Sequence, residues 1–308
     1  MITFLLRRVL LAIPVVVGVS IMAFSIMHLL PGDPAQIMLA GTSNASAQSI
    51  ARLRHELGLD QPIYMQYIIW IGGALHGNLG RSFLDRTSVM SEILQNAPAT
   101  FELALAAMAI ALGVGLILGT LAAAFLHSWL DNICVLLGTV GTAMPNFWTS
   151  VLLILIFSLT LGWLPSTGGG DLQHLILPAL ALGLDFAAVN TRLVRTGLID
   201  VLEQDYVRTA RSKGVTRLRI ILRHALKNAL IPVVTIAGLQ FGNLLGGAVV
   251  VETVFARQGL GRMVLAGILG KDYPVVQGVV LFISVIYVVV NLGVDLVYGL
   301  LDPRIRYS

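Results

Sequence analysis

The sequence DVLEQDYVRTARSKGVTRLRIILRHALKNALIP, residues 200–232, decides the fold class, because it is a compact basic segment between two long apolar runs. Its basic side chains are Arg208, Arg211, Lys213, Arg217, Arg219, Arg223 and Lys227, and Gly214 interrupts it in the middle. Two membrane spans do not need so structured a loop merely to be joined. We therefore expect this segment to bind a partner on the cytoplasmic side of a membrane.

Composition supports a membrane location. The chain has 308 residues, of which 56% are hydrophobic and 12% are charged, and its mean hydropathy is +0.86. Soluble domains carry about 25% charged residues. Several apolar runs are long enough to cross about 30 Å of hydrocarbon, so we expect an all-α polytopic membrane protein. The single cysteine, Cys134, excludes an internal disulfide and a cysteine-based metal site.

Hydropathy predicts six spans, at about 9–30, 99–126, 132–161, 174–197, 229–252 and 275–300. Arg7 and Arg8 precede the first span, the basic segment joins the fourth to the fifth, and two arginines follow the sixth. The positive-inside rule puts all three groups, and hence both termini, in the cytoplasm. The first run is too long for a signal peptide and lacks a cleavage site, so we expect it to be retained.

We expect two regions along the chain. Residues 1–98 form the first span and an extracytoplasmic segment, and residues 99–308 form a core of five spans with a cytoplasmic loop at about 198–228. Within the first region, Ile50, Leu53 and Leu57 recur at helical spacing, and the run 63–75 is typical of an interfacial helix. This segment is either a structural cap or a surface for an extracytoplasmic partner.

Small residues and one proline predict how the spans pack. Glycines at steps of four let helix backbones approach closely, and they are Gly238, Gly242 and Gly246 in the fifth span and Gly115 and Gly119 in the second. Pro145 lies inside the third span and should kink it. Asn146 is placed to satisfy the carbonyl that this proline frees.

No catalytic constellation is present in the sequence. A Gly-x-x-x-x-Gly-Lys-Ser/Thr loop, a His-Glu-x-x-His motif and a Gly-x-Ser-x-Gly motif are all missing, and the six histidines are scattered. We therefore predict no catalytic residue, no metal site and no cofactor on this chain. No block of like charge resembles a nucleic-acid-binding arm, so nucleic acid is not an expected partner.

Polar residues inside the spans are the candidates for a translocation path. Asp185 lies well inside the fourth span, where a charge is costly and usually faces a cavity or a partner. Arg192 lies two turns further on nearly the same face. The alternative interpretation is a buried polar pair that joins helices. The full candidate set for the path is Asp185, Asn190, Asn146 and Gln240. Glu102 and Glu252 lie near outer span ends, where we expect them to be hydrated.

The basic segment itself predicts a helix, a turn and a second helix. The first helix should begin near Asp200, and Gly214 should end it in the left-handed conformation. Thr216 should cap the second helix, whose apolar face would be Val215, Leu218, Ile221 and Leu222. A basic amphipathic helix held on anionic lipid is the alternative, but it does not explain the break at Gly214.

These residues resemble a known family. The run Ala210-Arg-Ser-Lys-Gly214 followed by Asn228-Ala-Leu-Ile-Pro232 is similar to the cytoplasmic "EAA" signature of membrane subunits of ABC importers, with Arg208-Thr209-Ala210 in place of its leading Glu-Ala-Ala. Further motifs resemble the B-type permease of dipeptide, oligopeptide, glutathione and nickel uptake systems; they are Leu30–Pro34, Gly58–Pro62, Asp205–Gly214, Asp272–Gln277 and Asp302–Arg306.

The resemblance implies a type I importer half in the bacterial cytoplasmic membrane. It implies a homologous second permease subunit, two cytoplasmic ATPase subunits that hold ATP and Mg²⁺, and an extracytoplasmic solute-binding protein. The coupling residues would be Tyr206, Arg208, Ala210, Lys213, Gly214, Val215 and Arg219.

The substrate that the resemblance implies is a short peptide. Nickel or a metal chelate, glutathione or another small solute are alternatives within the class. A stand-alone secondary transporter is the rival from another class, but we see no convincing repeat between the two halves of the chain.

Overall fold

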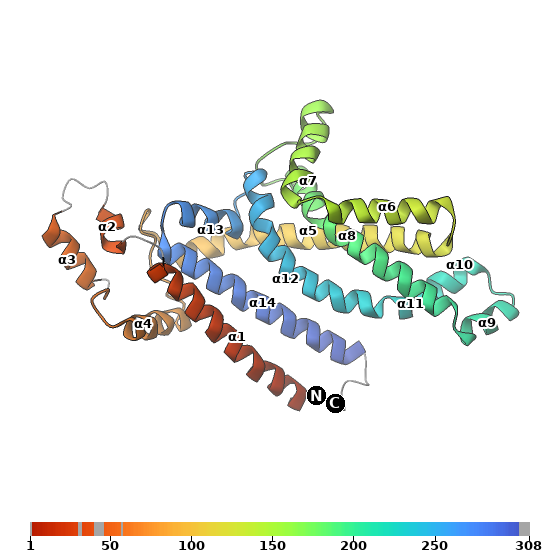
Figure 1. Ribbon diagram of the computed structural model, residues 1–308, viewed down its shortest axis with the longest axis horizontal. Coiled ribbons are helices and arrows are strands. Elements are labelled where there is room, and N and C mark those ends of the chain that lie inside the picture. The colour runs from red at the N-terminus through yellow and green to blue at the C-terminus, as the bar shows by residue number, and fades with distance from the viewer. Residues whose placement is uncertain (1, 30–32, 40–45, 57, 302–308) are drawn as a thin grey trace. The chain divides into compact units, whose positions relative to one another are not determined.

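The computed structural model describes residues 2–29, 33–39, 46–56 and 58–301, and this part of the chain is built from helices (Figure 1). In these ranges the one strand-like feature is an isolated bridge between Arg81 and Ser88. The all-α prediction is confirmed.

Five helices are long and apolar enough to cross a membrane, and a bent pair provides a sixth crossing if it is counted as one. The five are α1 (Ile2–Leu29), α5 (Val89–Ala124), α8 (Leu172–Leu202), α12 (Ile231–Val254) and α14 (Tyr273–Leu301). The pair is α6 (Trp129–Ala143) and α7 (Asn146–Leu153), the latter continued by the π-helix η1 (Ile154–Thr160). Each predicted span overlaps one of these elements. However, α5 begins ten residues earlier than the predicted start at residue 99.

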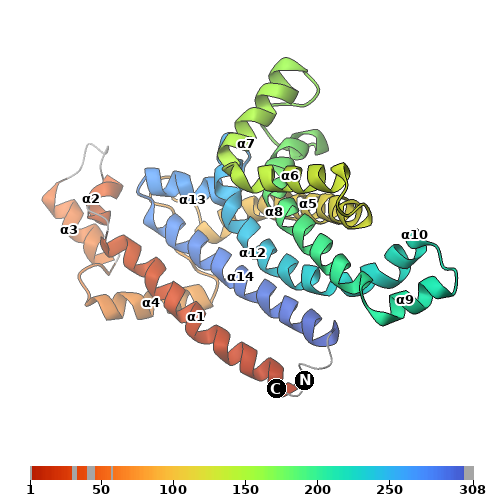
Figure 2. The ribbon, with the colours of Figure 1, turned by 45° about the vertical axis from the view of Figure 1, so that its right-hand side comes forward.

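The third span is broken at Pro145 and not merely kinked, which corrects the prediction. Its two helical parts meet at 108°, and Met144 between them has an extended backbone (φ −101°, ψ 126°). Proline disfavours a helical conformation at the residue before it, and it has no N–H to donate. Figures 1 and 2 show α7 leaving α6 at a steep angle. Within the described chain the Asn146 side chain makes no hydrogen bond, so it does not satisfy a freed carbonyl.

Contacts along the chain divide it into two compact units. The α8 unit comprises Thr100–Arg257 and Val290–Ser308, and the α1 unit comprises Ile2–Ala99 and Gln258–Val289. Residues 258–289 thus group with the first hundred residues, although they lie late in the sequence. The predicted boundary between residues 98 and 99 stays a prediction.

Glycines bring α5 and α8 into backbone contact within the α8 unit. A Cβ added at Gly119 would lie 2.6 Å from the carbonyl oxygen of Thr191, and one added at Gly115 would lie 2.5 Å from the Cβ of Asn190. From the α8 side, a Cβ on Gly183 would lie 2.6 Å from the carbonyl oxygen of Ala107. The packing role predicted for Gly115 and Gly119 is confirmed.

The glycines of α12 do not act as one surface. Gly238 packs directly against the Val294 side chain of α14, whereas a Cβ on Gly246 would meet nothing within 4 Å. Of the glycines predicted to form one packing surface, Gly238 packs within the chain and Gly246 has open space beside it.

In the α1 unit, α4 (Ile63–Leu75) has the bounds that the sequence predicted for an interfacial helix. The Tyr67 hydroxyl lies 2.8 Å from Ser20 Oγ of α1, and the Tyr67 ring packs edge-on against Phe24. Ile69, two residues after Tyr67 and therefore on the opposite side of α4, is 61% exposed. One face of α4 is thus fixed to α1, and the other is free for an interface.

Short helices complete the α1 unit. They are α2 (Pro34–Leu39), α3 (Ala47–Glu56) and α13 (Leu260–Leu269). The helix predicted from Ile50 and Leu53 is α3, while Leu57 lies outside the described residues. The buried Asp272 accepts hydrogen bonds from Ser82 Oγ at 2.5 Å and from the Phe83 N–H at 3.0 Å. This carboxylate ties the loop before α5 to the turn before α14.

Candidate functional site

The predicted docking site is an ordered projection of the α8 unit, which we call the coupling segment (residues 203–230). It contains α9 (Asp205–Ser212), α10 (Arg217–Arg219), the π-helix η2 (Ile220–Ala225) and α11 (Leu226–Ala229). Figures 1 and 2 show α9 and α10 beyond the adjoining ends of α8 and α12. The first helix begins at Asp205 and not near Asp200, because α8 continues to Leu202.

Gly214 ends α9 in the left-handed conformation, as predicted, with φ +79°. The Gly214 N–H donates to the Arg211 carbonyl at 2.9 Å, and the Val215 N–H donates to the Ala210 carbonyl at 3.2 Å. This pair of hydrogen bonds is a Schellman motif, which satisfies carbonyls that a helix end leaves free. The turn is therefore a defined structure.

Thr216 occupies the N-cap position of α10, with an extended backbone (φ −65°, ψ 146°), but its side chain makes no capping hydrogen bond. The predicted position was right and the predicted bond was wrong. The following helix needs less support at its start, because it is fixed by packing further on.

Buried apolar side chains fix the coupling segment to its unit. Val207 of α9 is fully buried. Ile221 and Ala225 of η2 join a core cluster with Leu198 and Val201 of α8. These contacts mean that a force on the coupling segment is transmitted to α8.

A polar contact adds to this attachment. Asn228 Nδ2 of α11 donates to the Tyr206 hydroxyl of α9 at 3.1 Å. This hydrogen bond joins the last helix of the coupling segment to its first. No local pattern in the sequence indicated this bond, since the two residues are 22 positions apart.

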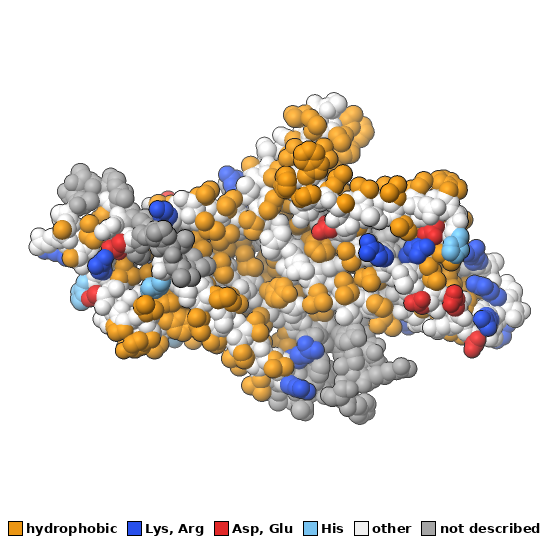
Figure 3. All heavy atoms as spheres, viewed as in Figure 1, with side chains coloured by type: hydrophobic (Ala, Val, Ile, Leu, Met, Phe, Trp, Pro, Cys, Tyr) orange, Lys and Arg blue, Asp and Glu red, His pale blue; other side chains and the backbone are white. Residues whose placement is uncertain are grey.

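The apolar face predicted for the second helix was partly wrong. Ile220 and Ile221 are buried, whereas Leu218 is 67% exposed and Leu222 is 54% exposed. Leu222 lies in the π-helix η2, whose wider turn an α-helical projection does not describe. Leu218 lies before it, in α10. The exposed surface of the segment thus combines leucines with basic side chains, which gather over α9 and α10 in Figure 3.

The predicted coupling residues fall into two groups. Tyr206, Arg208, Lys213, Gly214 and Arg219 are exposed, and Arg208 makes one long ion pair of 3.8 Å with the exposed Asp205. Ala210 and Val215 are half-buried within the Schellman turn. The arrangement offers cations and apolar groups on a rigid support, and among the described residues no group of His, Cys, Asp or Glu could hold a metal ion.

Two of the predicted path residues bind each other. Asn190 Nδ2 donates to Gln240 Oε1 and Gln240 Nε2 donates to Asn190 Oδ1, both at 3.1 Å. Both side chains are buried, so this amide pair joins α8 to α12 and is not exposed to a path in this structure.

The other two path residues are more open. Asp185 of α8 is half-buried, and within the described chain its carboxylate makes no hydrogen bond or ion pair. Asn146 and Leu182 both lie beside Gly247 of α12. A Cβ added at Gly247 would be 4.0 Å from Asn146 Nδ2 and 3.3 Å from Leu182 Cδ1. Asn146 is therefore close to the turn of α8 that precedes Asp185.

An ion pair that no pattern in the sequence predicted joins α6 to α8. Arg195 Nε and Nη2 donate to the two carboxylate oxygens of Asp131 at 2.7 and 2.8 Å. The backbone N–H of His127 also donates to Asp131, and Ser128 accepts a hydrogen bond from the Asp131 N–H. Asp131 lies between two predicted spans, beside His127, Ser128 and Asn132, so nothing in the sequence indicated that it has a partner 64 residues away.

Glu252 is fully buried and accepts a hydrogen bond from Thr100 Oγ1 at 2.6 Å, so the expectation of a hydrated side chain was wrong. Near it, the buried Arg257 donates to Glu102 at 2.5 Å. Helix packing places these charges between α5 and the end of α12, where hydropathy alone suggested a water-exposed boundary.

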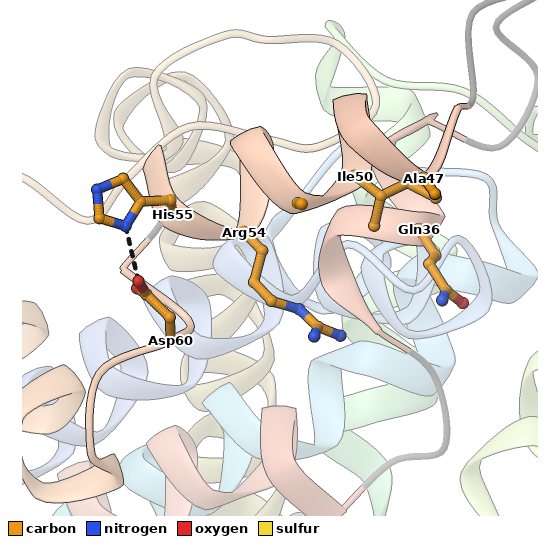
Figure 4. Close-up of a pocket in the computed structure, with 7 residues that line it drawn as sticks. Gln36, Ala47, Ile50, Arg54, His55 and Asp60 are labelled. Carbon is orange, nitrogen blue, oxygen red and sulfur yellow. Dashed lines mark hydrogen bonds and ion pairs between the residues drawn. The ribbon is translucent and has the colours of Figure 1, made fainter.

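A pocket of about 300 Å³ lies in the α1 unit beside α3 (Figure 4). Its lining residues are Gln36, Ala47, Ile50, Ala51, Arg54, His55 and Asp60. Arg54 pairs with Asp33, and His55 Nδ1 lies 2.6 Å from Asp60, where its hydrogen bond lowers the pKa of the Asp60 carboxyl. The charges here are compensated within the segment.

Family models cover nearly the whole chain. The model described as "Binding-protein-dependent transport system inner membrane component" matches residues 115–307, and the model of the N-terminal part of such membrane components matches residues 1–104. The chain belongs to this family. It is thus a permease component of the type I ABC importer class, and it is a multi-pass protein of the inner membrane.

Known relatives of this permease extend over its full length. It is 45% identical over 312 residues to a Brucella abortus (strain 2308) permease assigned to a peptide transport system, with 99% of each chain covered. It is 43% identical to the glutathione transport system permease protein GsiC of Escherichia coli (strain K12) and 41% identical to the di/tripeptide transport system permease protein DppB of Pseudomonas aeruginosa. In both cases all of each chain is covered.

A solved structure shares the fold of this permease. A chain of the inward-facing MetNI methionine ABC transporter matches with a TM-score of 0.60 at 18% identity, and the match covers 69% of the permease and 97% of that chain. At this identity the likeness concerns the fold alone.

Proposed function

We propose that this permease is one of the two membrane-spanning subunits of an ATP-driven importer of short peptides. Both termini and the coupling segment would lie in the cytoplasm. The observation that carries the proposal is the coupling segment: a rigidly mounted, exposed basic turn in a chain that has no P-loop of its own. Such a turn suits the transfer of motion from a separate ATPase.

The proposed partners follow from this role. Two cytoplasmic ATPase subunits would hold ATP and Mg²⁺, and one of them would receive Leu218, Leu222 and the basic side chains in a groove. Because Ile221 and Ala225 pack on the core of the α8 unit, closure of the ATPases would move α8 with the segment. A homologous second permease and an extracytoplasmic solute-binding protein would complete the importer.

Short peptides are the proposed substrate class, because the relatives named above carry peptide, di/tripeptide and glutathione systems in their names. Glutathione is the second candidate, and it is itself a tripeptide. Nickel, a metal chelate and other small solutes are further candidates within the class, but none of the three relatives is named for them.

Reconstitution tests the proposal. The permease, its partner permease and the two ATPases are placed in proteoliposomes with the binding protein outside and ATP inside, and peptide uptake is measured. We expect uptake only when all components and ATP are present. Uptake by this permease alone, driven by an ion gradient, would instead establish a secondary transporter.

The substrate class has its own test. The solute-binding protein proposed to serve this permease is purified without added ligand, and the molecule that accompanies it is identified by mass spectrometry. We expect a short peptide or glutathione. A metal chelate would refute the peptide proposal while leaving the importer proposal intact.

A further inference from the structure

One flank of α8 carries charged side chains that the helix packing leaves open. Asp185, Val189, Arg192 and Thr196 follow at steps of four, three and four, so they share one face of the helix. Asp185 is half-buried and the other three are exposed. The remainder of α8 packs against α5, α6, α7, α11, η2 and α12. Figure 3 shows acidic and basic side chains over α8, with hydrophobic side chains around them.

Lipid is not a suitable environment for this face, which we call the charged strip (Asp185, Val189, Arg192 and Thr196). An acidic or basic side chain within a span is expensive in hydrocarbon, so it normally faces a water-filled cavity or a partner. In the described part of the chain neither Asp185 nor Arg192 makes a hydrogen bond or an ion pair. Their charges therefore remain available to a molecule other than the described part of the chain.

Other polar groups of the same unit are already engaged. Asn190 and Gln240 satisfy each other, and Arg195 is held by Asp131 in a bidentate ion pair. The Arg195–Asp131 pair shows what a structural ion pair in this unit looks like: it joins two helices through bonds of 2.7 and 2.8 Å. Asp185 and Arg192 lie on one helix, seven residues apart, and have no such partner among the described residues.

The spacing of the two charges matches a particular class of solute. Seven residues of helix rise by about 10 Å. An extended chain spans about 3.3–3.6 Å per residue, so a tripeptide places its ammonium and its carboxylate about 10 Å apart. A dipeptide spans about 7 Å, which the side chains of Asp185 and Arg192 can bridge by bending toward each other. The Asn146 amide, close to the turn before Asp185, adds a neutral hydrogen-bonding group.

We propose that the charged strip of α8 is a recognition site for zwitterionic short peptides, with Asp185 binding the free ammonium and Arg192 binding the free carboxylate. This inference rests on the proposed importer function and names its solute more narrowly. In the proposed orientation Asp185 is nearer the outer end of α8, so the peptide would lie with its amino end outward. The permease would then select for peptides with two free ends.

Direct binding tests this site. The assembled permease–ATPase complex is purified without the binding protein, and its affinity is measured calorimetrically for trialanine, N-acetyl-trialanine and trialanine amide. We expect the wild-type complex to bind trialanine, and each blocked end to weaken binding by about tenfold or more, as for the loss of a charged hydrogen bond. Equal affinities for all three peptides, or no binding of trialanine, would overturn the inference.

Two substitutions test which side chain binds which end of the peptide. Asp185→Asn should weaken trialanine binding by about tenfold without further weakening the N-acetyl peptide, and Arg192→Gln should do the same for the amide. Asp200→Asn removes an exposed acid from the cytoplasmic end of α8 and should change none of the affinities. If Arg192→Gln weakens all three peptides equally, Arg192 serves the membrane interface and the inference is wrong.

Failure of the proposed peptide site can be distinguished from failure of the proposed importer function. If the wild-type complex takes up peptide in proteoliposomes but does not distinguish free from blocked ends, the importer stands and the charged strip is not its peptide site. If the wild-type complex takes up no peptide with its binding protein and ATP, the proposed function itself fails.

Discussion

The Arg195 guanidinium holds the Asp131 carboxylate of α6 through two parallel hydrogen bonds of 2.7 and 2.8 Å. This bond fixes the start of α6 against α8, the helix that also receives the core of the coupling segment. The ion pair thus adds to the packing that holds α6 on α8, the helix that the ATPases are proposed to move.

Removing the Asp131 carboxylate should lower stability. Asp131→Ala leaves the Arg195 charge without its partner, and we expect a loss of about 2–4 kcal/mol, toward the low end for buried pairs because the Arg195 side chain is 26% exposed. The thermal midpoint of the purified complex measures this. Asp205→Ala, at a fully exposed carboxylate, serves as the control, and an equal effect of both changes would contradict the prediction.

The amide pair of α8 and α12 should behave as a coupled unit. Asn190→Leu or Gln240→Leu alone leaves a buried amide unsatisfied, which costs about 1–3 kcal/mol. The double leucine variant should lose less than the sum of the two single losses. A double-mutant cycle on the thermal midpoint measures the coupling. Strictly additive losses would mean that the two amides do not depend on each other.

Two glycines of α5 should respond in opposite directions. Gly119→Ala places a methyl group against the Thr191 carbonyl and the Val194 side chain, and it should destabilise by about 1–3 kcal/mol. Gly113→Ala is the matched control, because a Cβ there meets nothing within 4 Å. It should be neutral or stabilise by up to about 1 kcal/mol, since alanine favours a helix. Thermal melting of both variants checks the contrast.

The Schellman turn should be necessary for coupling. Gly214→Val forces a β-branched residue to φ +79°, at a cost of about 1–2 kcal/mol or a rearranged turn. We expect peptide uptake to fall several-fold while the permease still inserts into the membrane. Gly214→Asn tolerates the left-handed conformation better and should retain more uptake. Because a Cβ meets no neighbour here, full uptake by the valine variant would show that the turn is dispensable.

The basic side chains of the coupling segment should be needed for ATPase assembly. Arg208→Glu with Lys213→Glu reverses two exposed charges, and we expect the ATPase subunits to be lost from the purified complex. Arg52→Glu with Arg81→Glu makes the same change at exposed arginines of the α1 unit and should leave them bound. Normal recovery of ATPases with the first variant would assign these charges to the anionic lipid surface instead.

Much of the candidate site followed from local signals. A glycine after a short helix predicted the left-handed turn at Gly214, and a run of apolar residues with two tyrosines predicted α4 with its observed bounds. Other features did not follow. Leu222 was predicted to be buried but lies exposed in η2, and nothing in a periodic pattern signals such a π-helix.

Local sequence was enough to predict where the long apolar helices lie along the chain, where the basic segment lies and which conformation Gly214 adopts. These depend on hydropathy over about twenty neighbouring residues, or on the backbone freedom of a single residue. Which polar groups bind each other depends on how the helices pack. Asn190 meets Gln240, and Asp131 meets Arg195, because helices distant in sequence cross at those points. The same packing leaves Asp185 open, and the sequence alone does not specify where helices cross.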